Sequence, residues 1–243
     1  MEVCVDNVES AVNAANGGAS RLELCSALSE GGLTPTKGLL TIIKRLVSIP
    51  VFVMLRPRKG SDFVFSADEL EAIYTDALVL REAGADGFVF GALTHGGDVD
   101  IAACRRVIEI ASDKPVTFHR AFDVTCEPYG ALETIIDLGF SRLLTSGQAS
   151  SAEKGLELIK ELILRARNRI IVMPGAGITI KNLPVILNET KAREFHGSAR
   201  IPKQLVLRKI NCSMASDDDS AMLVTSTDVV REMVTIYSSY AST

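Results

Sequence analysis

The chain has no tryptophan, only three histidines and no excess of basic residues. Its 243 residues carry 26 Lys and Arg against 30 Asp and Glu, which gives a formal net charge of −4. A protein that binds nucleic acid through the phosphates normally presents a basic face. The charge balance therefore argues against nucleic acid as a partner and favours a small molecule or an ion.

The sequence also lacks a recognisable targeting segment or membrane span. Its first ten residues, MEVCVDNVES, have neither the basic start nor the apolar stretch of a signal peptide. The longest apolar stretch, Ile49 to Leu55, is far shorter than the roughly 20 residues that a membrane-spanning helix needs. Five cysteines are an odd number for a disulfide framework, so we expect reduced thiols and a cytoplasmic location.

Short apolar or β-branched runs alternate with amphipathic helical stretches along the chain. Eight such strand–helix units favour a single (β/α)8 TIM barrel over a doubly wound sheet, since no GxGxxG motif follows the first strand. We expect one domain over 1–243, with an irregular segment over 201–228 and a terminal helix over 229–240. The expected strands are Glu2–Val5, Arg21–Cys25, Val51–Arg56, Gly87–Gly91, Val116–His119, Arg142–Ser146, Ile170–Pro174 and Arg193–Gly197.

Polar residues recur near the ends of these strands, on positions that alternation places inside the barrel. The carboxyl ends of the strands form the functional face of a TIM barrel. Buried charges are costly unless they are paired, so we expect the ionic residues to form one hydrogen-bonded network. That predicted network contains Glu2, Glu23, Glu194, Arg56 and Arg120.

Two cysteines, Cys4 and Cys25, fall on neighbouring predicted strands. Paired strands lie about 4.8 Å apart, so two thiolates there could hold a soft ion such as Cu(I) or Zn²⁺. Their separation in sequence is not that of a CxxC clip, and free cysteine is also a common small core residue. The sequence leaves both interpretations open.

The polar residues at the carboxyl ends of the strands would also suit an enzyme that acts on a small phosphorylated or carboxylated metabolite. Glu23 or His119 could act as a general base, with Arg120 and Asp123 beside them, although no signature motif selects a reaction. An interaction scaffold is a third option, which the charged interior disfavours. The turns after the last strands could bind an anion, or their glycines could simply make tight turns. The predicted anion-binding residues are Arg56, Ser146, Gly147, Gly175, Gly177, His196 and Ser198.

In combination, the sequence blocks that contain these residues resemble the CutC copper-homeostasis family, and its animal members in particular. The resemblance implies one TIM barrel, a role in copper homeostasis, a cytoplasmic and also nuclear location, and a homo-oligomer such as a dimer or tetramer. It implies Cu(I) binding by cysteines that match Cys4 and Cys25. Animal members often have a cysteine where this chain has Gly197. The matching blocks are Arg21–Cys25, Glu30–Pro35, Val53–Arg58, Asp86–Gly91, Thr117–Asp123, Leu144–Gln148, Pro174–Ile178 and Glu194–Ser198.

Overall fold

The computed structural model describes residues 1–204 and 221–241 of the chain. Eight parallel strands form a nearly closed barrel, in the order β7-β6-β5-β4-β3-β2-β1-β8. Most strand residues are buried on both faces, as expected where helices cover a parallel sheet. The strands are β1 Glu2–Val5, β2 Arg21–Leu24, β3 Val51–Met54, β4 Gly87–Phe90, β5 Val116–Phe118, β6 Arg142–Thr145, β7 Ile171–Pro174 and β8 His196–Gly197.

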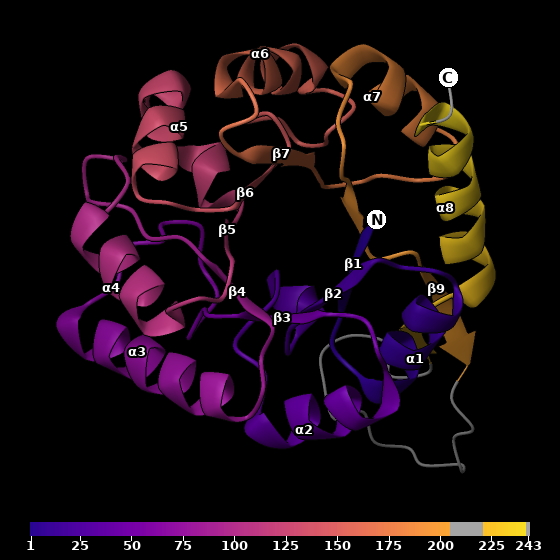
Figure 1. Cartoon of the computed structure of the whole chain (residues 1–243), viewed down its shortest axis with the longest axis horizontal. Coiled ribbons are helices and arrows are strands. Elements are labelled where there is room, and N and C mark those ends of the chain that lie inside the picture. The colour runs from indigo at the N-terminus through magenta and orange to yellow at the C-terminus, as the bar shows by residue number, and fades with distance from the viewer. Residues whose placement is uncertain (205–220, 242–243) are drawn as a thin grey trace.

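Helices surround the barrel as an outer ring (Figure 1). The sequence from Ser66 to Glu69, SADE, has the pattern of a capping box. This box is present at the start of α3, where the side chains and backbones of Ser66 and Glu69 bond reciprocally. Two 3₁₀ turns, Leu28–Glu30 and Arg120–Val124, follow β2 and β5. The helices are α1 Val8–Asn16, α2 Lys37–Leu46, α3 Ala67–Glu82, α4 Ile101–Ala111, α5 Pro128–Asp137, α6 Leu156–Ala166, α7 Leu183–Thr190 and α8 Thr227–Ala241.

The terminal helix expected over 229–240 corresponds to α8, which completes the ring between α7 and α1 (Figure 1). Its close approach to α1 requires a glycine at the end of α1. A Cβ atom on Gly17 would lie 2.6 Å from Cβ of Val230. The eight predicted strands and the TIM-barrel fold are therefore confirmed, with strand ends that differ by a few residues.

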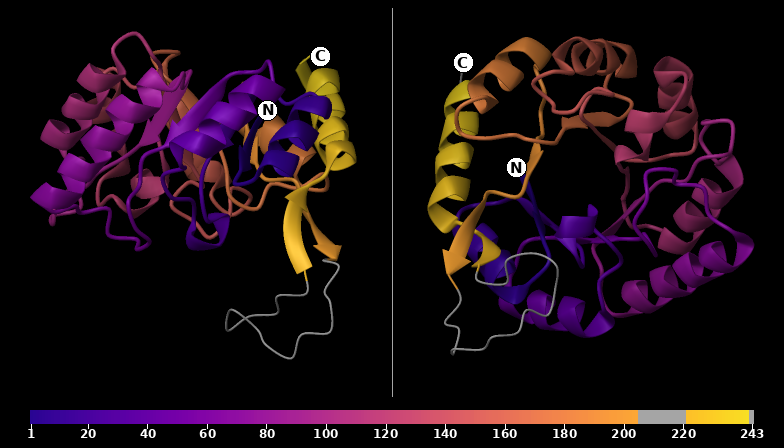
Figure 2. Two further views of the ribbon diagram at one scale, coloured as in Figure 1. Left: turned by 90° about the horizontal axis from the view of Figure 1, so that it is seen from below. Right: turned by 180° about the vertical axis from the view of Figure 1, so that it is seen from behind.

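We expected the segment 201–228 to be irregular, but parts of it form strands. Strands β9 (Arg200–Gln204) and β10 (Ala221–Thr225) pair antiparallel and form a ribbon that projects from the barrel wall (Figure 2). The base of the ribbon is held by α1, because the Thr225 N–H donates to Ser10 Oγ and Asn13 Nδ2 donates to the Thr225 carbonyl. The sequence SDDDS at Ser216–Ser220 also predicts a loop, and these residues lie outside the described ones.

Candidate functional site

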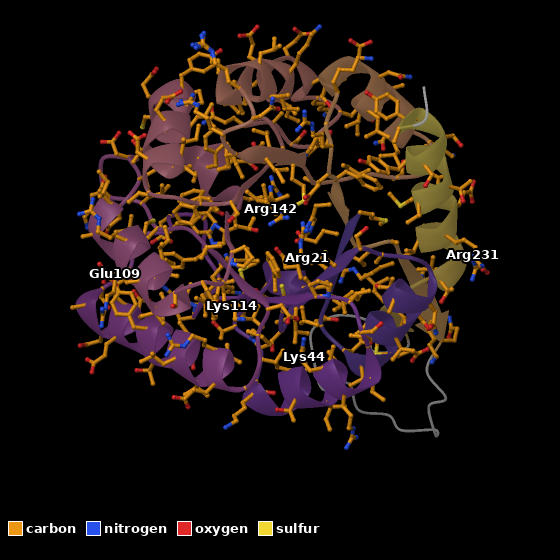
Figure 3. The ribbon with its side chains drawn as sticks, viewed as in Figure 1. Arg21, Lys44, Glu109, Lys114, Arg142 and Arg231 are labelled. Carbon is orange, nitrogen blue, oxygen red and sulfur yellow. The ribbon has the colours of Figure 1, made fainter. Side chains whose placement is uncertain are left out.

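An ionic network occupies the end of the barrel where the strands begin. Arg21 donates from Nε to Glu2 Oε2 at 2.5 Å and from an η nitrogen to Glu194 at 2.6 Å. Arg142 Nε donates to the same Glu194 carboxylate at 2.8 Å. Both guanidinium groups also lie over the ring of Phe52 and near the barrel axis (Figure 3). These buried charges therefore have partners of opposite sign, which is the condition for tolerating them there.

The composition of this network differs from the one that we expected. Arg56 and Arg120 do not belong to it, because they follow the ends of β3 and β5, whereas Glu2 begins β1. Arg21 and Arg142, the first residues of β2 and β6, supply the positive charge instead. Arg21 has the same strand parity as Glu23, and that alternation is the signal that could have identified it.

One layer further along the barrel, three side chains with metal-binding groups meet. A thiol sulfur of Cys4, a carboxylate oxygen of Glu23 and an imidazole nitrogen of His196 all lie within 4.8 Å of one another. The pairing of β1 with β2 places Cys4 directly opposite Glu23. His196 comes from β8, on the other side of β1. This cluster, Cys4–Glu23–His196, is hereafter the thiol–imidazole cluster.

The charges around the cluster favour a positive group at His196. Its Nδ1 lies 2.8 Å from Glu2 Oε1, and its Nε2 lies 3.8 Å from Glu23 Oε2. Burial alone would lower the pKa of His196, but Cys4, Glu23 and Glu2 together raise that pKa well above its usual value. Burial likewise opposes ionisation of Glu2, yet the hydrogen bond from His196 and the charge of Arg21 hold its pKa at about 2.

Cys25 lies close to this cluster but not opposite Cys4. The strand register places Glu23, and not Cys25, beside Cys4, so the two cysteines are two residues out of step. Cys25 is fully buried, and its thiol donates to Glu23 Oε2 at 3.5 Å. Burial and the nearby Glu23 raise the pKa of Cys25 well above its usual value. The two cysteines therefore lie on neighbouring strands, as expected, but Cys4 is paired directly with Glu23, because register depends on how strands stagger around the barrel.

The thiol–imidazole cluster borders a cavity of about 550 Å³ at the carboxyl ends of the strands. This volume lies within the range of small-molecule sites, roughly 300–1,000 Å³. Several predicted site residues meet there, from β1, β2 and β8 and from the segments that follow β3, β5, β7 and β8. The predicted residues that line the cavity are Cys4, Glu23, Arg56, His119, Arg120, Asp123, Gly177, His196 and Ser198.

His119 is held rigidly at the end of β5. Its Nδ1 accepts a hydrogen bond from the Ala121 N–H at 3.2 Å, and its ring packs 5.0 Å from the ring of Phe63. A Cβ on Gly91 would lie 2.6 Å from Nδ1, so only glycine fits beside it. Burial, reinforced by the charge of Arg56, lowers the pKa of His119 to about 3. The ring is therefore neutral near pH 7, with its proton on Nε2.

Arg56 fixes two loops at the mouth of the cavity. One η nitrogen donates to the carbonyls of Glu30 and Gly32 at 2.9 and 3.0 Å, and the other donates to the Gly60 carbonyl at 2.7 Å. Among the described residues, no carboxylate oxygen lies within ion-pair distance of Arg56. Its positive charge therefore reaches the cavity wall without a partner of opposite sign.

The turn after β6 is already occupied by a carboxylate of the protein itself. Asp123 accepts hydrogen bonds from the Ser146 N–H, the Ser146 hydroxyl and the Thr145 hydroxyl. Arg120 donates to the same carboxylate at 2.7 Å. Ser146 thus binds Asp123, and the N–H of the buried Gly147 donates to the Thr145 hydroxyl oxygen at 2.8 Å. The donors predicted for an external anion are therefore used within the fold.

The glycines after β7 serve different purposes. A Cβ on Gly175 would lie 2.6 Å from a methyl group of Leu144, so this glycine permits close packing of β6 against β7. Gly177, with a φ of +71°, lines the cavity together with Ser198. Two further lining residues that the sequence did not indicate are Ile178 and Arg200. Arg200 begins β9, whose other residues belong to the segment that we expected to be irregular.

Comparison with known proteins places the chain in a family. The CutC family model matches residues 1–201. The chain belongs to the CutC family. A human copper homeostasis protein cutC homolog is 55% identical over 215 residues, covering 88% of this chain and 78% of the human protein. The Drosophila melanogaster copper homeostasis protein cutC homolog is 43% identical over 251 residues and covers 100% of this chain and 95% of its own.

Solved structures agree with this assignment and with the fold. The crystal structure of CutC from Streptococcus agalactiae superposes with a TM-score of 0.77 at 32% identity, covering 81% of this chain and 97% of that one. An aldolase, QR15, superposes with a TM-score of 0.62 at 12% identity and covers 82% and 89% of the two chains, which shows a shared fold alone. Within the described residues of this CutC chain, no helix has the length and apolarity to cross a membrane.

Proposed function

We propose that this chain serves copper homeostasis by binding Cu(I) at the thiol–imidazole cluster. The observation that supports this proposal is the convergence of a thiol, an imidazole and a carboxylate within 4.8 Å on the wall of a cavity. The names of the curated relatives, copper homeostasis protein cutC homologs, point to the same metal.

The donor types fit Cu(I) better than a hard cation. Thiolates are preferred ligands of Cu(I), and imidazole also binds copper, whereas Mg²⁺ and Ca²⁺ prefer sets of oxygen ligands. Cys4 would supply the sulfur and His196 the nitrogen. A cation bound at Nε2 of His196 in place of the proton would be attracted by the carboxylates of Glu2 and Glu23.

Cys25 has a separate place in this proposal. Its thiol donates to Glu23 Oε2, the carboxylate oxygen that also faces His196 Nε2, and Cys25 packs in one apolar group with Met54. We infer that Cys25 is a reserve thiol, which becomes a ligand when Cu(I) draws Glu23 aside. Its loss should therefore weaken binding less than the loss of Cys4.

A titration of the reduced protein with Cu(I) under a competing chelator tests the assignment. We expect one tightly bound ion per chain, lost or weakened by at least about tenfold in Cys4→Ser and His196→Ala. Cys104→Ser is a matched control, because Cys104 is buried in α4 away from the cavity. Unchanged affinity and stoichiometry in Cys4→Ser would rule out thiolate coordination at this cluster. A parallel titration with Zn²⁺ shows whether the site prefers Cu(I).

A further inference from the structure

Unsatisfied polar atoms gather around the cavity. Within the described part of the chain, four buried side-chain nitrogen or oxygen atoms have no hydrogen-bond partner: Glu23 Oε1, Thr117 Oγ1, His119 Nε2 and Arg200 Nε. Three of these four atoms belong to residues that line the cavity. Buried polar groups in proteins are almost always paired, so a cluster of exceptions in one cavity indicates a missing partner.

Two of these atoms are hydrogen-bond donors. His119 is neutral, and because its Nδ1 accepts from the Ala121 N–H, the remaining proton lies on Nε2. Arg200 is always protonated, and its Nε carries a proton as well. His119 follows β5 and Arg200 follows β8, and these strands are not neighbours in the barrel. A ligand that contacts both residues must therefore reach across the cavity.

The charged side chains that line the cavity indicate that its ligand carries a negative charge. Three arginines line the cavity, namely Arg56, Arg120 and Arg200. Arg120 is neutralised by Asp123, but Arg56 donates only to backbone carbonyls. An anion in the cavity would therefore be attracted by Arg56 and Arg200, for which the described part of the chain supplies no carboxylate partner.

We propose that the cavity binds a small organic oxyanion, with an oxygen that accepts a hydrogen bond from His119 Nε2 and a negative charge that faces Arg200 and Arg56. A carboxylate or a phosphate provides the required acceptor oxygens and charge. This site is separate from the proposed Cu(I) ligands, although the two share one cavity. The chain would then bind a metabolite as well as a metal ion.

Calorimetric titration of the whole chain with four probes tests the proposal, with a chelator present to exclude copper. Succinate and pyruvate represent carboxylates, while inorganic phosphate and glycerol 3-phosphate represent phosphates. We expect binding by at least one of these probes, and the class that binds identifies the group. The absence of binding by all four would overturn the proposal.

Substitutions then locate the bound probe. In His119→Asn the side-chain oxygen can replace Nδ1 as acceptor for Ala121, but the Nε2 donor is lost, so affinity should fall about tenfold or more. His119→Gln places an amide N–H near the Nε2 position and should restore part of the binding. Arg200→Lys should weaken binding. Arg169→Ala should not, because Arg169 lies outside the cavity lining and contacts Glu133 and the carbonyls of Arg165 and Ala166 instead. Equal affinity in wild type, His119→Asn and Arg200→Lys would refute the site.

A measurement on the unmodified protein covers the case in which a variant fails to fold. The chain has three histidines, so ¹⁵N-histidine labelling gives few signals, and His95→Gln assigns the exposed one. The Nε2–H resonance of His119 should shift when a bound probe is added. A probe that binds in calorimetry while this resonance stays unchanged would place the ligand elsewhere and refute the proposal.

Discussion

Replacing His119 with asparagine should make the stability of the protein less sensitive to acid. The wild-type imidazole is buried and neutral, with its Nδ1 bonded to the Ala121 N–H. Asparagine can keep that hydrogen bond while removing the titrating group. The charges that face the ring are Arg56 and Arg120, which disfavour its protonation, and Asp123, which favours it.

The size of the effect follows from the two pKa values of His119. Its pKa is about 3 in the folded chain and 6.5 as the ordinary value. Because the folded-state pKa is depressed, the associated stability is present above pH 6.5 and is lost as the pH falls from there toward 3. Over that window the unfolded chain binds one more proton, which costs about 1.4 kcal/mol per pH unit.

Urea denaturation from about pH 7 to about pH 4 measures this effect. The free energy of unfolding should fall more steeply with acid in wild type than in His119→Asn. The difference between the two proteins should change by roughly 2–3 kcal/mol between about pH 6 and about pH 4. Other titrating groups cancel in this comparison. A difference that stays constant over the whole range would refute the assignment of His119 as a buried neutral imidazole.

Two further substitutions test the ionic network and the packing of the barrel. Glu2→Gln should destabilise the protein by roughly 3–5 kcal/mol in urea denaturation, since it leaves the charges of Arg21 and His196 less compensated; a change below about 1 kcal/mol would show that the network is dispensable. Gly147→Ala should destabilise by about 1–3 kcal/mol or more, because its Cβ would lie 2.3 Å from the Gly155 carbonyl oxygen at a φ of +70°. Gly130→Ala is its matched control, with nothing within 4 Å of the added atom, and should be neutral or stabilising; equal losses in both variants would contradict the steric argument.

Local sequence patterns were sufficient for the elements of the fold. The alternation of short apolar runs with helical stretches predicted all eight barrel strands, and Ser66 with Glu69 predicted the start of α3. These features depend on neighbouring residues, which the sequence displays directly. The ribbon of β9 and β10 was missed because the exposed side chains from Ile201 to Gln204 show no buried alternation.

The details of the site depend on contacts between distant segments. Cys4 and His196 meet because β1 pairs with β8, and strand parity predicted that both side chains face inward. The pairing of Cys4 with Glu23 in place of Cys25 follows from the stagger of the strands, which no local pattern encodes. The role of Asp123 as the internal ligand of the Ser146 turn was equally out of reach, since 23 residues separate them.

Copper K-edge X-ray absorption on the reduced, Cu(I)-loaded chain tests the central claim most directly. The proposed cluster predicts sulfur and imidazole nitrogen around the metal, with the sulfur contribution lost or reduced in Cys4→Ser and kept in Cys104→Ser. A spectrum that is the same for wild type and Cys4→Ser, or one that contains only oxygen and nitrogen ligands, would contradict the assignment of Cys4 as a Cu(I) ligand.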